Sequence, residues 1–149
     1  MPQSPLAKVR LYELPGANET PRVLSFVESE SEQIPFSIKR MYWLHDLAPG
    51  VKRGHHGHRC LRQVMICMTG EVIVTIRDGV QSVSYRLDSA SQGLYLPAGL
   101  WREIETPTTV SSASTLVNLA SEHFSEADYI RNFDDYCNWA AETEWGRKR

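Results

Sequence analysis

The sequence of 149 residues lacks any long uninterrupted apolar run. No stretch approaches the roughly 20 apolar residues that a membrane helix needs, so we expect no membrane partner. Residues 1–6 do not combine a basic segment with a following apolar run, which argues against a signal peptide. Together these absences predict a cytoplasmic protein.

The chain also lacks a strong charge of either sign, since 16 Lys and Arg stand against 18 Asp and Glu. Without a basic field, the composition gives no support for a nucleic-acid partner. Cysteine is scarce, and Cys60, Cys67 and Cys137 are an odd number at unpatterned spacings. We therefore expect free thiols in a reducing compartment rather than a disulfide framework.

What the sequence does contain is many short segments in which apolar and polar side chains alternate, separated by turn residues such as Pro15, Gly16 and Asn18. Alternation with period two predicts half-buried strands, and Asp78-Gly79 predicts a hairpin. We expect strands over residues 8–14, 23–27, 36–44, 63–68, 71–77, 82–87, 93–97 and 114–119, and around Ile104 and Val110. So many short strands indicate an antiparallel barrel or sandwich.

Two segments carry finer expectations. In the strand over 36–44, Phe36, Ile38, Met41 and Trp43 supply the apolar side chains, and their parity changes after Ile38, which predicts a bulge or burial on both faces. Near the end, Ser125 and Asp128 resemble a capping box, and apolar residues then recur at helical spacing. We expect one domain over 1–149, with a barrel over about 8–120 and a C-terminal helix over about 125–140, where Trp139 and Trp145 pack.

The most distinctive segment is Arg53-Gly54-His55-His56-Gly57-His58, with three imidazoles in four positions. Histidine titrates near neutral pH and is the commonest metal ligand. Because an apolar run follows at 64–68, the histidines are expected to lead into a sheet. Alternation places the side chains of His56 and His58 on one face, which in a barrel could be the interior, and leaves His55 as a flanking residue.

This segment resembles the first motif of the cupin superfamily, whose members are small jelly-roll barrels. That motif reads His-x-His, four residues, Glu, six residues, Gly, and the corresponding positions here hold His56, His58, Gln63 and Gly70. The second cupin motif reads Gly, five residues, Pro-x-Gly, two residues, His, and it is approximated here, with a shorter first interval, by Gly93, Pro97, Gly99 and Arg102.

The two departures from these motifs concern metal binding. Metal cupins hold their ion with the two histidines, the Glu and the second-motif His, and this chain has Gln63 and Arg102 at the last two positions. A neutral amide is a weaker ligand than a carboxylate, and an arginine cannot give up its proton to bind a cation. We therefore predict no metal and no cofactor. Two interior histidines without a metal indicate proton transfer.

A closer resemblance is to the dTDP-4-keto-6-deoxyglucose 3,4-ketoisomerases, metal-independent cupins. It rests on Ile-Pro-Phe at 34–36, Lys-Arg-x-Tyr at 39–42, Arg-Gly-x-His-x-His at 53–58 and Asp-Tyr-Ile-Arg at 128–131, with further similar segments at 61–63, 87–90, 93–95, 97–101, 119–121 and 132–134. The sequence departs from the family at 21–24, where members have an Arg-Gly-x-Leu-like element, and at Arg102, where members often keep a His. Arg102 leaves the stereochemistry of the product open.

The resemblance implies an isomerase that moves the keto group of a dTDP-linked 4-keto-6-deoxyhexose from C4 to C3 through an enediol or enediolate, in the biosynthesis of deoxy or amino sugars. It implies that His56 is the base and that His58 carries the second proton or holds sugar oxygens. Arg53 would stabilise the enediolate or the diphosphate, and Tyr42, on the preceding strand, is a candidate hydrogen-bond donor. Weaker substrate-binding candidates are Arg40, Gln63, Trp101, which could stack on thymine, and Arg102.

The resembled family is typically dimeric, so we expect a homodimer with N-terminal strands exchanged or packed across the interface. Three other functions stay open at this point. They are a metal-dependent cupin enzyme such as a dioxygenase or a simple sugar isomerase, a non-catalytic module that binds nucleotide sugars, and an epimerase that acts on the same kind of substrate.

Overall fold

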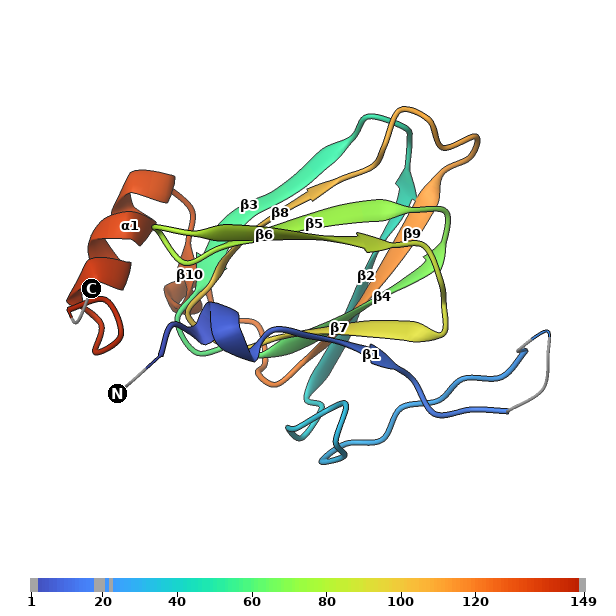
Figure 1. The fold of residues 1–149 in the computed structure, drawn as a ribbon, viewed down its shortest axis with the longest axis horizontal. Helices are drawn as coiled ribbons and strands as arrows, with labels where there is room; N and C mark the ends of the chain where they lie inside the picture. Colours follow the sequence, from blue (N-terminus) through green and yellow to red (C-terminus); the bar gives the residue numbers. More distant parts are fainter. Residues whose placement is uncertain (1–2, 18–20, 22, 148–149) are drawn as a thin grey trace.

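The computed structural model describes residues 3–17, 21 and 23–147, and it is mainly β, with two antiparallel sheets and one C-terminal helix (Figure 1). The first sheet has the order β1-β7-β4-β9-β2 and the second the order β10-β3-β8-β5-β6. The strands are β1 (Arg10–Glu13), β2 (Arg40–Leu47), β3 (Lys52–His58), β4 (Gln63–Thr69), β5 (Val72–Arg77), β6 (Ser82–Leu87), β7 (Gln92–Leu96), β8 (Trp101–Glu105), β9 (Ser114–Ala120) and β10 (Tyr129–Ile130). The helix is α1 (Phe133–Glu142), and the 3-10 turns are η1 (Pro5–Lys8) and η2 (Glu126–Asp128).

The main core is formed by side chains from both sheets. In β5, Val72, Val74 and Ile76 are fully buried while the residues between them are partly exposed, which is the expected alternation. They pack in one cluster with Met65, Leu94 and Leu116 of the first sheet. The hairpin at Asp78 is also confirmed, because β5 and β6 pair directly and the Asp78 carboxylate accepts hydrogen bonds from the next turn residues.

A second apolar cluster covers the other face of the first sheet. Ile34 and Phe36 pack there against Val64 and Ile66 of β4, so β4 is buried on both faces. This packing explains why the strand expected over 36–44 starts only at Arg40. The expected bulge after Ile38 is wrong, since the parity changes where the covering loop ends, and the bulge lies between Leu44 and Leu47.

The inner and outer faces of β2 are the reverse of what the apolar side chains suggested. Tyr42 and Leu44 face inward, whereas Met41 and Trp43 are 56% and 53% exposed. This orientation places the phenol ring of Tyr42 between the two sheets.

Two of the expected strands are wrong. Over 23–27 there is only a single bridge between Gly16 and Ser25, and Val23 and Leu24 are exposed. Asn18 and Arg22, expected in the turn and near this strand, lie outside the described residues. Val110 lies in a turn, where its amide N–H donates to the carbonyl of Pro107, and not in a strand.

The C-terminal helix begins eight residues later than expected. Asn132 caps α1 by accepting a hydrogen bond from the amide of Asp135, whereas Ser125 makes no capping bond. The Asp128 carboxylate is bonded to β3 instead, and Tyr129 pairs with β3 as part of β10. A 3-10 turn over Glu126–Asp128 and the short strand β10 over Tyr129–Ile130 therefore occupy the segment where the helix was expected to start.

Trp139 and Trp145 pack around the buried ring of Tyr136, as expected. Within the described part of the chain, no helix is long and apolar enough to cross a membrane. Cys60, Cys67 and Cys137 are not joined by disulfide bonds.

Candidate active site

A cavity of about 110 Å³ lies between the two sheets, lined by side chains from six strands. Its walls are Tyr42 and Leu44 of β2, Arg53, Gly54 and His56 of β3, Gln63 and Met65 of β4, Arg102 and Ile104 of β8, Asn118 of β9 and Tyr129 of β10. The structure thus brings together five of the residues selected from the sequence: Tyr42, Arg53, His56, Gln63 and Arg102. His58 lies behind this wall, in contact with His56 and Tyr129.

The bulge in β3 sets the directions in which the histidine side chains point. The pairing of β3 with β8 shifts between Gly54 and His56, and both Gly54 and His55 have positive φ, at 82° and 57°. A Cβ on Gly54 would lie 3.0 Å from the carbonyl oxygen of Arg102, so glycine also permits the close approach of β8. The inserted His55 is exposed, as expected for a flanking residue, and His56 pairs with Arg102.

Two histidine rings stand beside one another at this site. The ring centroids of His56 and His58 are 4.9 Å apart, and Tyr129 contacts both rings. His58 is fully buried, and its Nδ1 lies 2.7 Å from Oδ2 of Asp128. An ionised carboxylate accepts the hydrogen bond, which assigns the proton to Nδ1 and leaves Nε2 with its lone pair. Nε2 of His58 is buried and has no hydrogen-bond partner among the described residues.

The surroundings favour the neutral form of both imidazoles. Burial, and then the charge of Arg102, lower the pKa of His56 to about 4. The same two causes lower the pKa of His58. Asp128 acts on His58 in the opposite direction, but the ring is buried completely and several arginines surround it. At pH 7 both rings are therefore neutral, and each has one nitrogen with a lone pair.

A chain of three polar side chains crosses from one sheet to the other. Nη1 of Arg102 donates to Oε1 of Gln63 at 2.7 Å, and Nε2 of Gln63 donates to Oδ1 of Asn118 at 2.9 Å. Arg102 is 1% exposed, and burial lowers its pKa to about 10, so the guanidinium stays charged at pH 7. Its Nε and Nη2, and Nδ2 of Asn118, have no hydrogen-bond partner among the described residues.

Arg40 lies beside the cavity without lining it. Its guanidinium carbon is 4.9 Å from the ring centroid of Tyr42 and 5.7 Å from that of Phe124. The Nε and Nη2 atoms of Arg40 are buried and unpartnered among the described residues. Burial raises the pKa of Tyr42, so its phenol keeps its proton and can donate a hydrogen bond. Arg53 is exposed at the edge of the cavity.

Trp101, expected to bind substrate, is on the wrong side of β8 for that role. Neighbouring residues in a strand point to opposite faces, so Arg102 inside places Trp101 outside. Trp101 is 3% exposed and packs with Tyr136 and Phe133, and its Nε1 donates to Glu103. The structure therefore separates Trp101 from the cavity.

Three residues around the cavity were missed in the sequence. Asn118 is a buried polar residue between the apolar Val117 and Leu119 in β9, and this local exception was a usable signal. Asp128 and Tyr129 were assigned to a helix start, although the Asp-Tyr-Ile-Arg segment already marked the ketoisomerase resemblance. Among the described residues, no group of three or more His, Cys, Asp or Glu side chains is placed to hold a metal ion.

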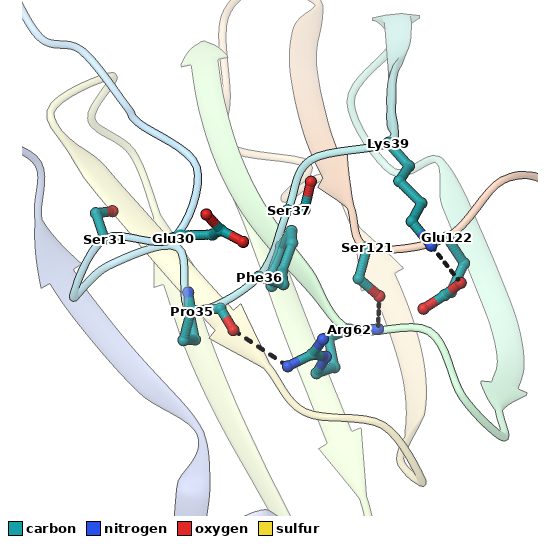
Figure 2. A pocket seen from close by; sticks show the side chains of 9 residues that line it. All are labelled: Glu30, Ser31, Pro35, Phe36, Ser37, Lys39, Arg62, Ser121 and Glu122. Atoms are coloured by element: carbon teal, nitrogen blue, oxygen red, sulfur yellow. Dashed lines mark hydrogen bonds and ion pairs between the residues drawn. The ribbon is translucent and has the colours of Figure 1, made fainter.

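A larger pocket of about 610 Å³ lies on the outer side of the first sheet (Figure 2). Its walls include Arg62, which donates to the carbonyl of Pro35, and Lys39, which pairs with Glu122. It shares no lining residue with the inter-sheet cavity and contains no histidine. The histidine and the arginine whose pKa values are strongly lowered, His56 and Arg102, line the smaller cavity, which we take as the candidate active site.

A mainly β protein that buries paired neutral histidines, a charged arginine and a tyrosine around one cavity has the features of an enzyme for acid–base chemistry. Residues 7–141 match the family model described as "FdtA: WxcM-like, C-terminal". The chain belongs to this family.

The similar proteins with names are sugar isomerases. A curated relative from Aneurinibacillus thermoaerophilus, named TDP-4-oxo-6-deoxy-alpha-D-glucose-3,4-oxoisomerase, is 38% identical over 112 residues, which cover 75% of this chain and 78% of the relative. The sugar 3,4-ketoisomerase of Thermoanaerobacterium thermosaccharolyticum, solved with TDP, is 33% identical with a TM-score of 0.81, covering 92% and 97% of the two chains. A mutant of that enzyme, solved with TDP-4-keto-6-deoxyglucose, is 32% identical with a TM-score of 0.81, covering 91% and 96%.

Proposed function

We propose that this protein is a sugar-nucleotide 3,4-ketoisomerase that moves the keto group of a dTDP-linked 4-keto-6-deoxyhexose from C4 to C3. The observation that carries the proposal is the position of His56. Its neutral imidazole lies in the wall of a cavity that is also lined by the buried, positively charged side chain of Arg102. Support comes from the relatives, which include a named 3,4-oxoisomerase and an enzyme solved with TDP-4-keto-6-deoxyglucose.

The reaction is a pair of proton transfers. The C4 carbonyl acidifies the proton on C3, and a base removes it, so that the C–H electron pair forms a C3=C4 double bond and the carbonyl oxygen becomes an oxyanion. The hydroxyl proton of O3 then passes to O4, a proton adds to C4, and the lone pair on O3 forms the new carbonyl at C3. The step needs a base that is neutral at working pH and donors that stabilise the oxyanion, and it requires no redox cofactor.

His56 is the proposed base. Its ring contacts the rings of His58 and Tyr129, and in the neutral form one of its nitrogens carries no proton and can accept one. His58 lies beside His56 and does not line the cavity, so we assign it the role of supporting His56 and carrying the second proton. Tyr42 lines the cavity with its phenol protonated and is the proposed donor to a sugar oxygen.

The size of the cavity divides the substrate between an inner and an outer part. Pockets for whole drug-sized ligands have volumes of about 300–1,000 Å³, so 110 Å³ suits the sugar ring and leaves the nucleotide outside. Arg53 is exposed at the cavity edge, and Arg40 has two unpartnered donors beside it. A guanidinium pairs with two phosphate oxygens at once, so we assign these arginines to the diphosphate. Trp101 is buried against Tyr136 and Phe133 and is not available to stack on thymine.

We further propose a single domain over 1–149 in which the two sheets form a cupin-type jelly roll, and a homodimer that uses the N-terminal segment. The exposed apolar side chains of Val23, Leu24 and Phe26, and of Met41 and Trp43 on the edge strand β2, support a partner surface on the first sheet. Sedimentation equilibrium tests this. The wild type is expected to be a dimer, and Trp43→Glu is expected to dissociate at lower dilution than the wild type. A wild-type monomer would contradict it. A cytoplasmic location stays a prediction, and three cysteines that form no disulfide agree with it.

The direct test is incubation with dTDP-4-keto-6-deoxyglucose in deuterated water, followed by NMR of the product. We expect a C3 ketone with deuterium at C4. An epimerase would keep the C4 ketone and invert a neighbouring carbon, whereas a binding module would bind the nucleotide sugar without any exchange of protons. Either of these results would refute the proposal.

A further inference from the structure

The guanidinium of Arg102 is a buried charge that no side chain of the described residues neutralises directly. It is 1% exposed, its one hydrogen bond goes to the neutral amide of Gln63, and its Nε and Nη2 have no partner there. Burying a charge without pairing is costly in free energy. A protein that keeps such a group places it where a ligand supplies the missing oxygens.

Nε and Nη2 form one edge of the guanidinium, and this edge has a known use elsewhere in the same chain. Nε and Nη2 of Arg77 donate to the two carboxylate oxygens of Glu103 at 3.3 and 3.4 Å. The same atoms of Arg131 donate to the two oxygens of Glu126 at 2.6 and 2.9 Å. The edge therefore fits a pair of nearby coplanar oxygens that share a negative charge.

Gln63 sets the orientation of this group. Because Arg102 can only donate, Oε1 of Gln63 must face it, and Nε2 of Gln63 is then directed to Oδ1 of Asn118. That bond turns Nδ2 of Asn118 away from Gln63, and Nδ2 is the third buried donor without a partner among the described residues. Arg102 and Asn118 both line the cavity.

We propose that Arg102 and Asn118 bind the two oxygens of the enediolate intermediate, and that Gln63 is the positioning residue that holds both donors in place. This inference rests on the proposed ketoisomerase function. Around the C3=C4 double bond, O3 and O4 are coplanar neighbours, which matches the donor edge of Arg102.

The bidentate contact serves both halves of the reaction. When the base removes the C3 proton, the carbonyl π pair moves onto O4, which becomes the oxyanion. The hydroxyl proton on O3 then passes to O4, so the negative charge moves to O3. C4 takes up a proton as the O3 lone pair reforms a carbonyl at C3. One guanidinium in contact with both oxygens stabilises the charge before and after its transfer.

The other arginines near the site are less suited to this role. Arg53 is exposed, where water weakens its interaction with an oxyanion, and Arg40 does not line the cavity. Their positions fit the diphosphate outside the cavity.

The discriminating variant is Gln63→Glu, which replaces the amide nitrogen by an oxygen and places a negative charge beside Arg102. The new carboxylate would pair with Arg102, and because it can only accept, it would turn the amide nitrogen of Asn118 toward itself. We expect kcat to fall about 10²–10³-fold, with KM changed less than about threefold and dTDP binding by calorimetry unchanged. The buried cation also gains a partner, so Tm should rise by about 2–4 °C. Gln81→Glu, the same change at an exposed turn, is the control and should leave kcat and Tm unaltered.

A second variant, Arg102→Lys, keeps a positive charge but removes the two-donor edge. We expect a lower kcat here as well, with dTDP binding retained. A wild-type kcat for Arg102→Lys, or for Gln63→Glu, overturns the inference while the ketoisomerase function stands. A Tm of Gln63→Glu that does not rise also overturns it, because Arg102 would then not be unpaired. If the wild type itself gives neither product nor deuterium exchange, the proposed function fails, and the enediolate assignment fails with it.

Discussion

Nδ1 of His58 lies 2.7 Å from Oδ2 of Asp128, and Oδ1 of the same carboxylate accepts the amide N–H of Cys60 at 2.6 Å. Asp128 is thus held by the backbone just beyond β3 while it holds a ring on β3. The two bonds fix the tautomer and the position of His58. His58 in turn contacts His56, the proposed base, so Asp128 acts on the chemistry through two rings.

Replacing Asp128 by Asn should lower kcat at least about tenfold, but less than the loss of about 10²–10⁴ expected when a general base is removed. The amide keeps the size of the side chain but can also turn its NH₂ group toward His58 and so select the other tautomer. Steady-state kinetics with a dTDP-4-keto sugar provide the measurement. Asp134→Asn, at an exposed position in α1, is the matched control. Unchanged kcat in Asp128→Asn would show that the bond has only a structural role.

His56→Asn should lose about 10²–10⁴ in turnover, the usual cost of removing a general base. The protein should stay folded and still bind dTDP, because His56 is only partly buried and the nucleotide lies outside the cavity. His55→Asn is the control one position away, since His55 is exposed on the bulge. Near-wild-type turnover by His56→Asn would remove His56 from the base role.

The sequence predicts the strands with clear alternation, and these are the strands that position the site. Val72, Val74 and Ile76 show the pattern well because each face of β5 has one environment. The pattern fails where both faces are buried or where a polar residue points inward. Phe36 looked like part of a strand because it packs on the outer face of the first sheet, and Tyr42 looked like an outer residue because Met41 and Trp43 are apolar.

The parts of the site that the sequence does not predict depend on contacts between segments far apart in the chain. Asp128 follows His58 by 70 positions, and it bonds to that ring from a segment that forms a 3-10 turn and the short strand β10, where the spacing suggested the start of an α-helix. Local propensity carries no information on such a contact. The chain from Arg102 through Gln63 to Asn118 likewise joins three strands and two sheets, so it is visible only in the fold.

Exhaustive chelation should leave turnover unchanged. The sequence resemblance equates Gln63 and Arg102 with the carboxylate and imidazole ligands of metal cupins, and the Arg102 charge beside both histidines repels a divalent cation. The measurement is kcat before and after dialysis against a strong chelator, with metal analysis of the same samples. Loss of activity that one divalent ion restores would overturn the metal-independent assignment.

The activity should persist to unusually low pH for a histidine base. Burial and Arg102 lower the pKa of His56 to about 4, so the ring remains neutral and able to accept a proton well below the ordinary value of about 6.5. We expect kcat/KM to be flat from pH 7 to about 5 and to decline toward pH 4. A decline centred near 6.5 would show that the free enzyme uses a base with an ordinary pKa.

The free energy of unfolding should depend on pH through the same two histidines, and it should decrease as the pH falls. In the unfolded chain His56 and His58 titrate near 6.5, whereas in the folded protein burial lowers the pKa of both. As pH falls below 6.5, the unfolded state therefore binds more protons than the folded state, and the free energy of unfolding decreases. Urea denaturation at pH 7, 6 and 5 measures the trend, and it should be less steep in His58→Gln, which lacks the more strongly shifted ring. An equal slope in the variant would place the proton uptake on other groups.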